Sequence, residues 1–162
     1  MSDSNQTSMD PDGRSALLSH ARRAAKHAYA PYSLFPVGAA VLTADGSIHT
    51  GCNVENASYG LTVCAERAAV SAAVGAGSRE IIAVAVSAPR APLTTPCGAC
   101  RQFLSEFRPQ ATDMVVILDD GDSGSALLLD ELLPNSFGPR TLDSKAQVAD
   151  PGAGAARGDH GS

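Results

Sequence analysis

Two short motifs contain the cysteines whose spacing could support chemistry. Cys97 and Cys100 lie three positions apart directly after Pro96, so the first turn of a helix would place both sulfurs on one face. This spacing suits a zinc site, but it also suits a redox pair or a disulfide. A third cysteine, Cys64, is followed two residues later by the carboxylate of Glu66. Three sulfur ligands would leave one position of a tetrahedral zinc ion open to water, and a carboxylate could move that water's proton, as in a catalytic zinc site.

The charge of such a site needs compensation, because three thiolates exceed the charge of one Zn²⁺ ion. We expect Cys64 and Cys97 near the starts of two helices, where the partial positive charge and the unpaired N–H groups would stabilise thiolates. Arg67 and Arg101 each lie next to one of these helix starts and could add a full positive charge. We favour this role for Arg67, whereas Arg101 fits it as well as it fits a surface ion pair.

The predicted role of Glu66 depends on where its helix begins. Inside a helix, side chains two positions apart point to nearly opposite sides. Cys64 and Glu66 can therefore converge only if the helix begins at Cys64, within a residue or two. The alternative is that Glu66 only complements the dipole of a helix start.

Composition narrows the classes of protein to consider. The chain has 162 residues, 44% of them hydrophobic, which suits one domain with a real core and two tails. Its formal net charge of -5 argues against nucleic acid as a partner. No stretch is long and apolar enough for a membrane span or a signal peptide, so we expect no membrane partner. Four cysteines suit a metal site in a reducing compartment, and we predict a cytoplasmic location.

The elements that must position these residues follow from hydrophobic periodicity and from turn residues. The sequence predicts helices over about 13–30, 63–74 and 97–107, and strands over 37–43, 48–54, 80–87, 114–118 and 126–129. This order predicts a three-layer α/β/α domain around a five-stranded mixed sheet. The last two strands should be antiparallel, because their connection is too short for a crossover. We expect a domain over 13–138, a disordered leader over 1–12 and a disordered tail over 139–162.

Several stretches of the sequence resemble one family. Cys-Ala-Glu followed by Pro-Cys-x-x-Cys is the signature of the zinc-dependent nucleoside and nucleobase deaminases. Over about residues 14–138 the chain resembles, more narrowly, the small cytidine deaminases that form homotetramers, and the motifs occur in the family's order. The similar stretches are Ala30–Ser33, Phe35–Ala40, Gly51–Tyr59, Cys64–Arg67 and Pro96–Gln102.

The resemblance implies a cytidine-deaminase-like fold and an enzyme of pyrimidine salvage. Its reaction would be the hydrolytic deamination of cytidine and 2′-deoxycytidine to uridine and 2′-deoxyuridine, with release of ammonia. Cys64, Cys97 and Cys100 would hold one zinc ion per chain. Glu66 would carry a proton from zinc-activated water to the ring nitrogen and then to the departing amine.

The resemblance also implies how the nucleoside is bound. The backbone of Ala65 would bind the carbonyl group of the base, and Phe35 would pack on the base or the sugar. Asn53 and Glu55 would hydrogen-bond the 3′-hydroxyl of the ribose. Phe137 would reach into the site of a neighbouring subunit, so that a homotetramer would share its active sites.

Three further residues stand near these groups. The resemblance implies that Arg67 contacts a metal ligand and offsets the charge of the thiolates, and that Gln102 lies next to the ligands without binding the metal. Cys52 matches a family position that is not a ligand position, and we interpret it as a small buried apolar residue.

Three other functions are compatible with parts of this sequence. A deaminase of a modified cytosine nucleoside, such as blasticidin S, would share both cysteine motifs, although Phe35 and the Asn53–Glu55 pair favour an ordinary ribose. A non-catalytic zinc domain would ligate Cys52 together with the other three cysteines. A deaminase that edits nucleic acids is disfavoured by the acidic net charge.

Overall fold

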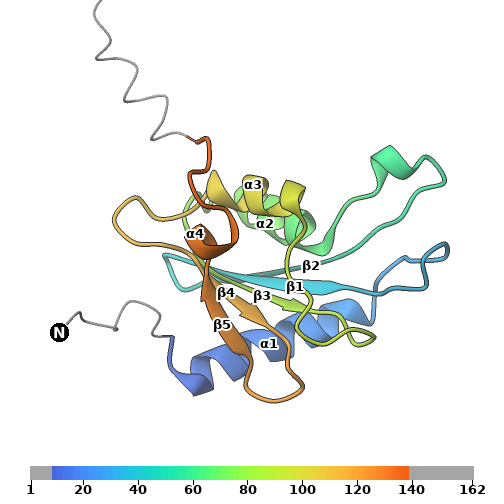
Figure 1. The fold of residues 1–162 in the computed structure, drawn as a ribbon, viewed down its shortest axis with the longest axis horizontal. Coiled ribbons are helices and arrows are strands. Elements are labelled where there is room, and N and C mark those ends of the chain that lie inside the picture. The colour runs from blue at the N-terminus through green and yellow to red at the C-terminus, as the bar shows by residue number, and fades with distance from the viewer. Residues whose placement is uncertain (1–8, 139–162) are drawn as a thin grey trace, which may run out of the picture.

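A mixed β-sheet between two layers of helices forms the frame of the molecule in the computed structural model, which describes residues 9–138 (Figure 1). The elements are α1 (Pro11–Ala25), β1 (Gly38–Thr43), β2 (Ile48–Cys52), a 3₁₀ turn (Tyr59–Leu61), α2 (Ala65–Gly75), β3 (Ile81–Ser87), α3 (Gly98–Ser105), β4 (Val115–Leu118), β5 (Ser125–Leu128) and the single turn α4 (Leu129–Leu132). The strand order is β2-β1-β3-β4-β5. Only the β3–β4 pair is parallel, and β4–β5 is antiparallel as predicted. The predicted fold class is confirmed.

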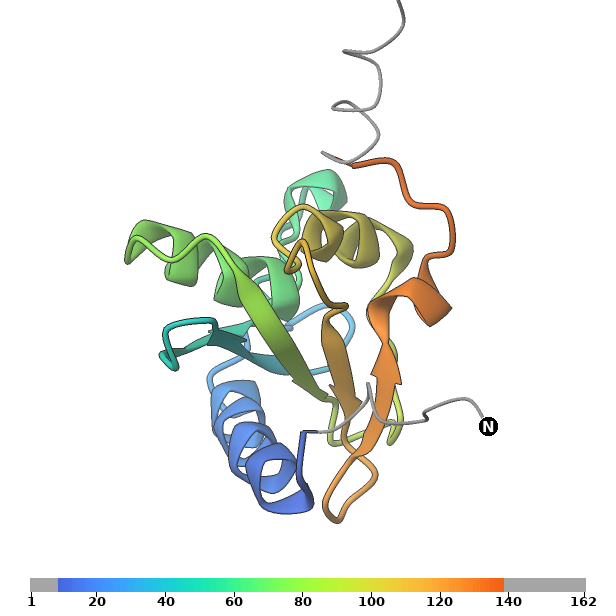
Figure 2. The ribbon, with the colours of Figure 1, turned by 90° about the vertical axis from the view of Figure 1, so that its left-hand side faces the viewer.

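The sheet is covered on both faces. Helix α1 lies against one face, and α2 and α3 lie on the other (Figure 2). Strand β3, in the middle of the sheet, is buried along almost its whole length, as expected of a continuous apolar run with helices on both sides. Leu17 and Leu18 of α1 pack with Ile117 on one face, while Val84 packs with Leu104 on the other. Within residues 9–138, no helix is both long enough and apolar enough to cross a membrane.

Helix α1 begins earlier than the sequence predicted. It begins at Pro11, and the side chain of Asp10 caps it by accepting a hydrogen bond of 2.8 Å from the N–H of Gly13. Residues 10–12, which we had assigned to a disordered leader, therefore form the cap and the start of the helix. The predictions for residues 1–8 and 139–162 lie outside the described residues.

The same helix also ends earlier, at Ala25 rather than near Ala30. The reason is a pairing between Tyr29 and the chain that follows β2. The N–H of Tyr29 donates to the carbonyl of Asn53 (3.0 Å), and the carbonyl of Tyr29 accepts from the N–H of Glu55 (2.8 Å). These bonds draw the backbone into an extended conformation and place the loop after α1 beside Glu55.

Two glycines let the helices approach the sheet closely. A Cβ atom on Gly51 of β2 would lie 2.4 Å from the backbone N of Ala69 and 2.6 Å from the carbonyl oxygen of Ala65, both in α2. A Cβ atom on Gly38 of β1 would lie 2.3 Å from the backbone N of Ala25 in α1. Since the contacted atoms belong to the helix backbone, they cannot move without shifting the whole helix. The position of α2, which carries Glu66, therefore depends on Gly51.

Gly51→Ala should lower the free energy of unfolding by about 1–3 kcal/mol, because the added methyl group must push α2 away from β2. Gly75→Ala is the matched control, since a Cβ atom at the end of α2 meets nothing within 4 Å. That control should be neutral or stabilising by up to about 1 kcal/mol. Chemical denaturation of both variants measures the difference. Equal stability of the two variants would contradict the close packing.

Candidate active site

Three of the four cysteines meet at one place. The sulfur atoms of Cys64, Cys97 and Cys100 all lie within 4.8 Å of one another. Tetrahedral zinc with Zn–S bonds of about 2.3 Å holds its sulfurs about 3.8 Å apart. Small side-chain movements would therefore seat the ion, and these three residues fit it as ligands.

Cys52 lies outside this cluster. It is only half-buried, and its thiol donates a hydrogen bond to the carbonyl of His27 (3.5 Å). The interpretation of Cys52 as a buried apolar residue was therefore too simple. A closed four-cysteine zinc site is wrong for this chain, because the fourth sulfur has another place in the fold.

The two helix starts carry the metal ligands, as the charge argument requires. Cys64 is the N-cap residue of α2, and Cys97 is the N-cap residue of α3. Both have extended backbones, with φ/ψ of -73°/154° and -67°/165°. Cys100 lies in the first turn of α3 and is buried. The three sulfurs thus lie at two helix starts, although the sulfurs of Cys64 and Cys97 accept no capping hydrogen bond from a backbone N–H group.

The carboxyl group of Glu66 is buried beside this cluster. Its residue is only 5% exposed and lies in the first turn of α2. The sequence condition for its convergence with Cys64 holds, since the helix begins directly after that cysteine. Burial raises the pKa of Glu66, and the negative charge of Cys64 adds to the rise. A carboxyl group with a raised pKa is suited to take up and release a proton near neutral pH.

Arg67 touches one of the sulfurs directly. Its Nη2 donates to the carbonyl of Thr62 (3.0 Å) and to the Sγ of Cys64 (3.6 Å). A hydrogen bond with Cys100 and the guanidinium of Arg67 together hold the pKa of Cys64 well below that of an ordinary thiol. This favours the thiolate form of Cys64, which is the form that binds a metal cation.

Within the described residues, Arg101 neither compensates the charge of a sulfur nor forms a surface ion pair, the two roles that its sequence position allowed. Its Nε donates to the carbonyl of Pro96 (2.7 Å), and its Nη2 donates to the hydroxyl of Thr95 (3.0 Å). Its Nη1 reaches the carbonyl of Leu132 (2.9 Å). Arg101 thus ties the loop before Cys97 to the end of α4 rather than contacting a sulfur or a carboxylate.

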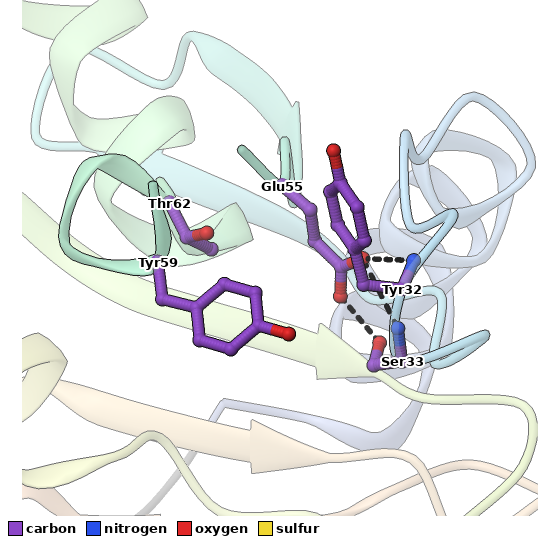
Figure 3. A pocket seen from close by; sticks show the side chains of 5 residues that line it. All are labelled: Tyr32, Ser33, Glu55, Tyr59 and Thr62. Carbon is purple, nitrogen blue, oxygen red and sulfur yellow. Dashed lines mark hydrogen bonds between the residues drawn. The ribbon is translucent and has the colours of Figure 1, made fainter. Parts of the chain in front are cut away.

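A pocket of about 430 Å³ has Thr62 in its wall. Figure 3 shows the five residues that line it, and the rings of Tyr32 and Tyr59 meet edge to face with 6.1 Å between their centroids. The pocket-lining residues are Tyr32, Ser33, Glu55, Tyr59 and Thr62. The carbonyl of Thr62 accepts from Arg67, so one guanidinium group connects the pocket wall to the sulfur of Cys64.

Glu55 and Asn53 organise the loop that follows α1. The Oε2 atom of Glu55 accepts from the backbone N–H groups of Tyr32 (2.9 Å) and Ser33 (3.2 Å), and Oε1 accepts from the hydroxyl of Ser33. These bonds, led by that of the Ser33 hydroxyl, lower the pKa of Glu55. The buried amide of Asn53 donates to the carbonyl of Phe35 (2.9 Å) and accepts from the N–H of Val37 (2.8 Å).

The remaining predicted site residues lie on several elements. Ala65 is the first residue of α2, and the half-buried Phe35 lies in the loop held by Asn53. Phe137 is 59% exposed on the segment after α4, and its carbonyl accepts from Nε2 of Gln102 (2.8 Å).

Sequence reasoning gave no role to most of the pocket lining, notably Ser33. The only local signal was a serine in a turn led by Pro31. Its partner Glu55 lies 22 residues further along the chain. No spacing rule connects residues at that distance, so the contact emerges only from the fold.

Arg67→Gln should weaken zinc binding about 10- to 100-fold, because the thiolate of Cys64 loses its cationic neighbour. Zinc affinity is measured by competition with a chromogenic chelator. Arg79→Gln is the control, since that arginine donates to the carbonyl of Val74 at the opposite end of α2. Equal zinc affinity in the two variants would contradict the role of Arg67.

Comparison with known proteins agrees with this geometry. A family model described as the cytidine and deoxycytidylate deaminase zinc-binding region matches residues 12–117. The cytidine deaminase of Halalkalibacterium halodurans is 46% identical over 124 residues, which cover 76% of this chain and 93% of that protein. The crystal structure of the Burkholderia pseudomallei cytidine deaminase has a TM-score of 0.69 at 45% identity, covering 75% of this chain and 97% of that one. The corresponding structure from Mycobacterium tuberculosis has a TM-score of 0.67 at 42% identity, covering 76% and 95%. The chain therefore belongs to the family of zinc-binding cytidine and deoxycytidylate deaminases.

Proposed function

We propose that this chain is a zinc-dependent hydrolase that converts cytidine and 2′-deoxycytidine to uridine and 2′-deoxyuridine, with release of ammonia. The observation that carries the proposal is the cluster of Cys64, Cys97 and Cys100 beside the buried carboxyl group of Glu66. The similar proteins named above, each a cytidine deaminase, support the choice of substrate.

In this reaction the metal would activate water, and the protein would move the protons. A zinc ion held by the three cysteines would lower the pKa of water, so that a nucleophile forms at neutral pH. Glu66 would accept the proton that this water loses and pass it to N3 of the cytosine ring. It would later deliver a proton to the amine at C4. The oxygen of water then remains on C4 as a carbonyl, and nitrogen leaves as ammonia, so no further reactant is needed.

The protein would orient the nucleoside with groups on three elements. The N–H of Ala65 belongs to the first turn of α2, where N–H groups have no partner inside the helix, and would bind the carbonyl of the base. Glu55 and Asn53 would bind the ribose 3′-hydroxyl, and Phe35 would pack on the nucleoside. Both ribose and 2′-deoxyribose carry the 3′-hydroxyl, so both sugars should be accepted.

Glu66→Gln should lower kcat about 10²- to 10⁴-fold while zinc and cytidine still bind, because only the proton transfer is lost. The ultraviolet change that accompanies conversion of cytidine to uridine measures turnover, and a parallel sample stripped of zinc by a strong chelator should be inactive. Glu80→Gln, which alters an exposed carboxylate just before β3, is the control. Near-normal turnover of the Glu66 variant would refute its role, and turnover without zinc would refute the metal's.

We further propose that the chain forms a homotetramer in which Phe137 completes the active site of a neighbouring subunit. Exposed aromatic rings that lie together support this, because a contiguous apolar patch often marks a protein interface. The rings of Tyr32 and Tyr59 meet at the pocket with exposures of 51% and 77%, and Phe137 is also more than half exposed. Reduced thiol ligands also suit the cytoplasm as the location.

Light scattering should give a mass of four chains for the purified protein. Phe137→Ala should raise KM for cytidine and leave the zinc content unchanged, because the side chain would contact substrate and not metal. A monomer with full activity would overturn both the assembly and the shared site.

A further inference from the structure

We infer that Ser33 is a positioning residue for nucleoside recognition, because its hydroxyl group holds the carboxylate of Glu55 in the orientation that faces the pocket (Figure 3). The inference rests on the proposed function, in which Glu55 binds the ribose 3′-hydroxyl.

The direction of the hydrogen bonds around Ser33 is fixed. The backbone N–H of Phe35 can only donate, and it donates to Oγ of Ser33 (3.0 Å). The ionised carboxylate of Glu55 can only accept, and its Oε1 accepts from the same hydroxyl. The proton of Ser33 must therefore point at Glu55.

The two carboxylate oxygens of Glu55 have different amounts of acceptor capacity left. Each oxygen has about two lone-pair sites. Oε2 already accepts two backbone N–H groups, from Tyr32 and Ser33. Oε1 accepts only the hydroxyl of Ser33, so it retains the capacity to accept one more donor. A sugar hydroxyl that binds Glu55 would donate to Oε1, the oxygen that Ser33 orients.

The turn that contains Ser33 has an unfavourable backbone conformation, so hydrogen bonds such as those to Glu55 are needed to hold it. Its next residue, Leu34, has φ of 54°, a backbone conformation that residues with a side chain rarely adopt. The N–H of Leu34 donates to the carbonyl of Ala30 (3.0 Å), and its carbonyl accepts from Nη1 of Arg90 (2.6 Å). The turn is thus held by Arg90 on one side and by Glu55 on the other, and Ser33 supplies two of the three bonds to the carboxylate.

The first experiment compares three variants with the wild-type protein. Ser33→Ala should raise KM for cytidine roughly tenfold with little change in kcat, since a hydrogen bond to a charged group is lost. Ser33→Thr, which keeps the hydroxyl, should stay within about threefold of the wild-type KM. Ser58→Ala removes an exposed hydroxyl next to the 3₁₀ turn and should change nothing. Zinc content and melting temperature identify any variant that fails to fold, in which case Ser33→Thr alone decides whether the hydroxyl matters.

A double-mutant cycle with Glu55→Ala tests whether Ser33 acts through Glu55. In that background Ser33→Ala should raise KM by less than about twofold, and its effect in the wild type should be much smaller with 3′-deoxycytidine as substrate. An equal rise of KM in both backgrounds would overturn the inference and leave the proposed function standing. If Glu55→Ala does not raise KM for cytidine more than for 3′-deoxycytidine, the proposed sugar contact fails and the inference fails with it.

Discussion

The convergence of two helix starts on three sulfur atoms is the constraint on which the rest of this structure depends. Three sulfurs can bind one metal ion only if they lie close together, as those of Cys64, Cys97 and Cys100 do within 4.8 Å. Cys64 and Cys97 come together as the N-cap residues of two helices, and Arg67 adds a full positive charge beside Cys64. The starts of α2 and α3 must therefore lie close together, and the close contact between Gly51 and α2 limits where α2 can lie.

The loop that follows α1 has no regular structure to hold it, so its shape depends on side chains from elsewhere. Polar side chains that follow β2 provide this support, since Glu55 binds one end of the loop and Asn53 binds the other. The groups proposed to bind the sugar hydroxyl are therefore the same groups that hold the loop in its shape. A polar cluster at the end of a strand can serve turn geometry and ligand binding at once, so these two interpretations of the sequence do not exclude each other.

Periodicity and turn residues were enough to predict the five strands, the three main helices and the antiparallel last pair, because these features depend on local patterns and on connection length. The start of α2 directly after Cys64 meets the condition that the chemistry set, since Glu66 could not otherwise reach the sulfurs. The early end of α1 was not predictable, because it results from the pairing of Tyr29 with a segment more than twenty residues away. The contacts of Arg101 with Leu132 and of Ser33 with Glu55 were not predictable for the same reason, because these partners lie 31 and 22 residues away along the chain and are brought close only by the fold.

The position of Arg101 has a thermodynamic consequence. One guanidinium group binds the carbonyl beside Cys97 and the carbonyl that begins the segment leading to Phe137. Two equilibria that share one group are linked, and linkage acts equally in both directions. Metal binding and the position of the segment that ends in Phe137 should therefore affect each other. By the same reciprocity, a neighbouring molecule that contacts this segment would change the affinity of the three cysteines for their metal.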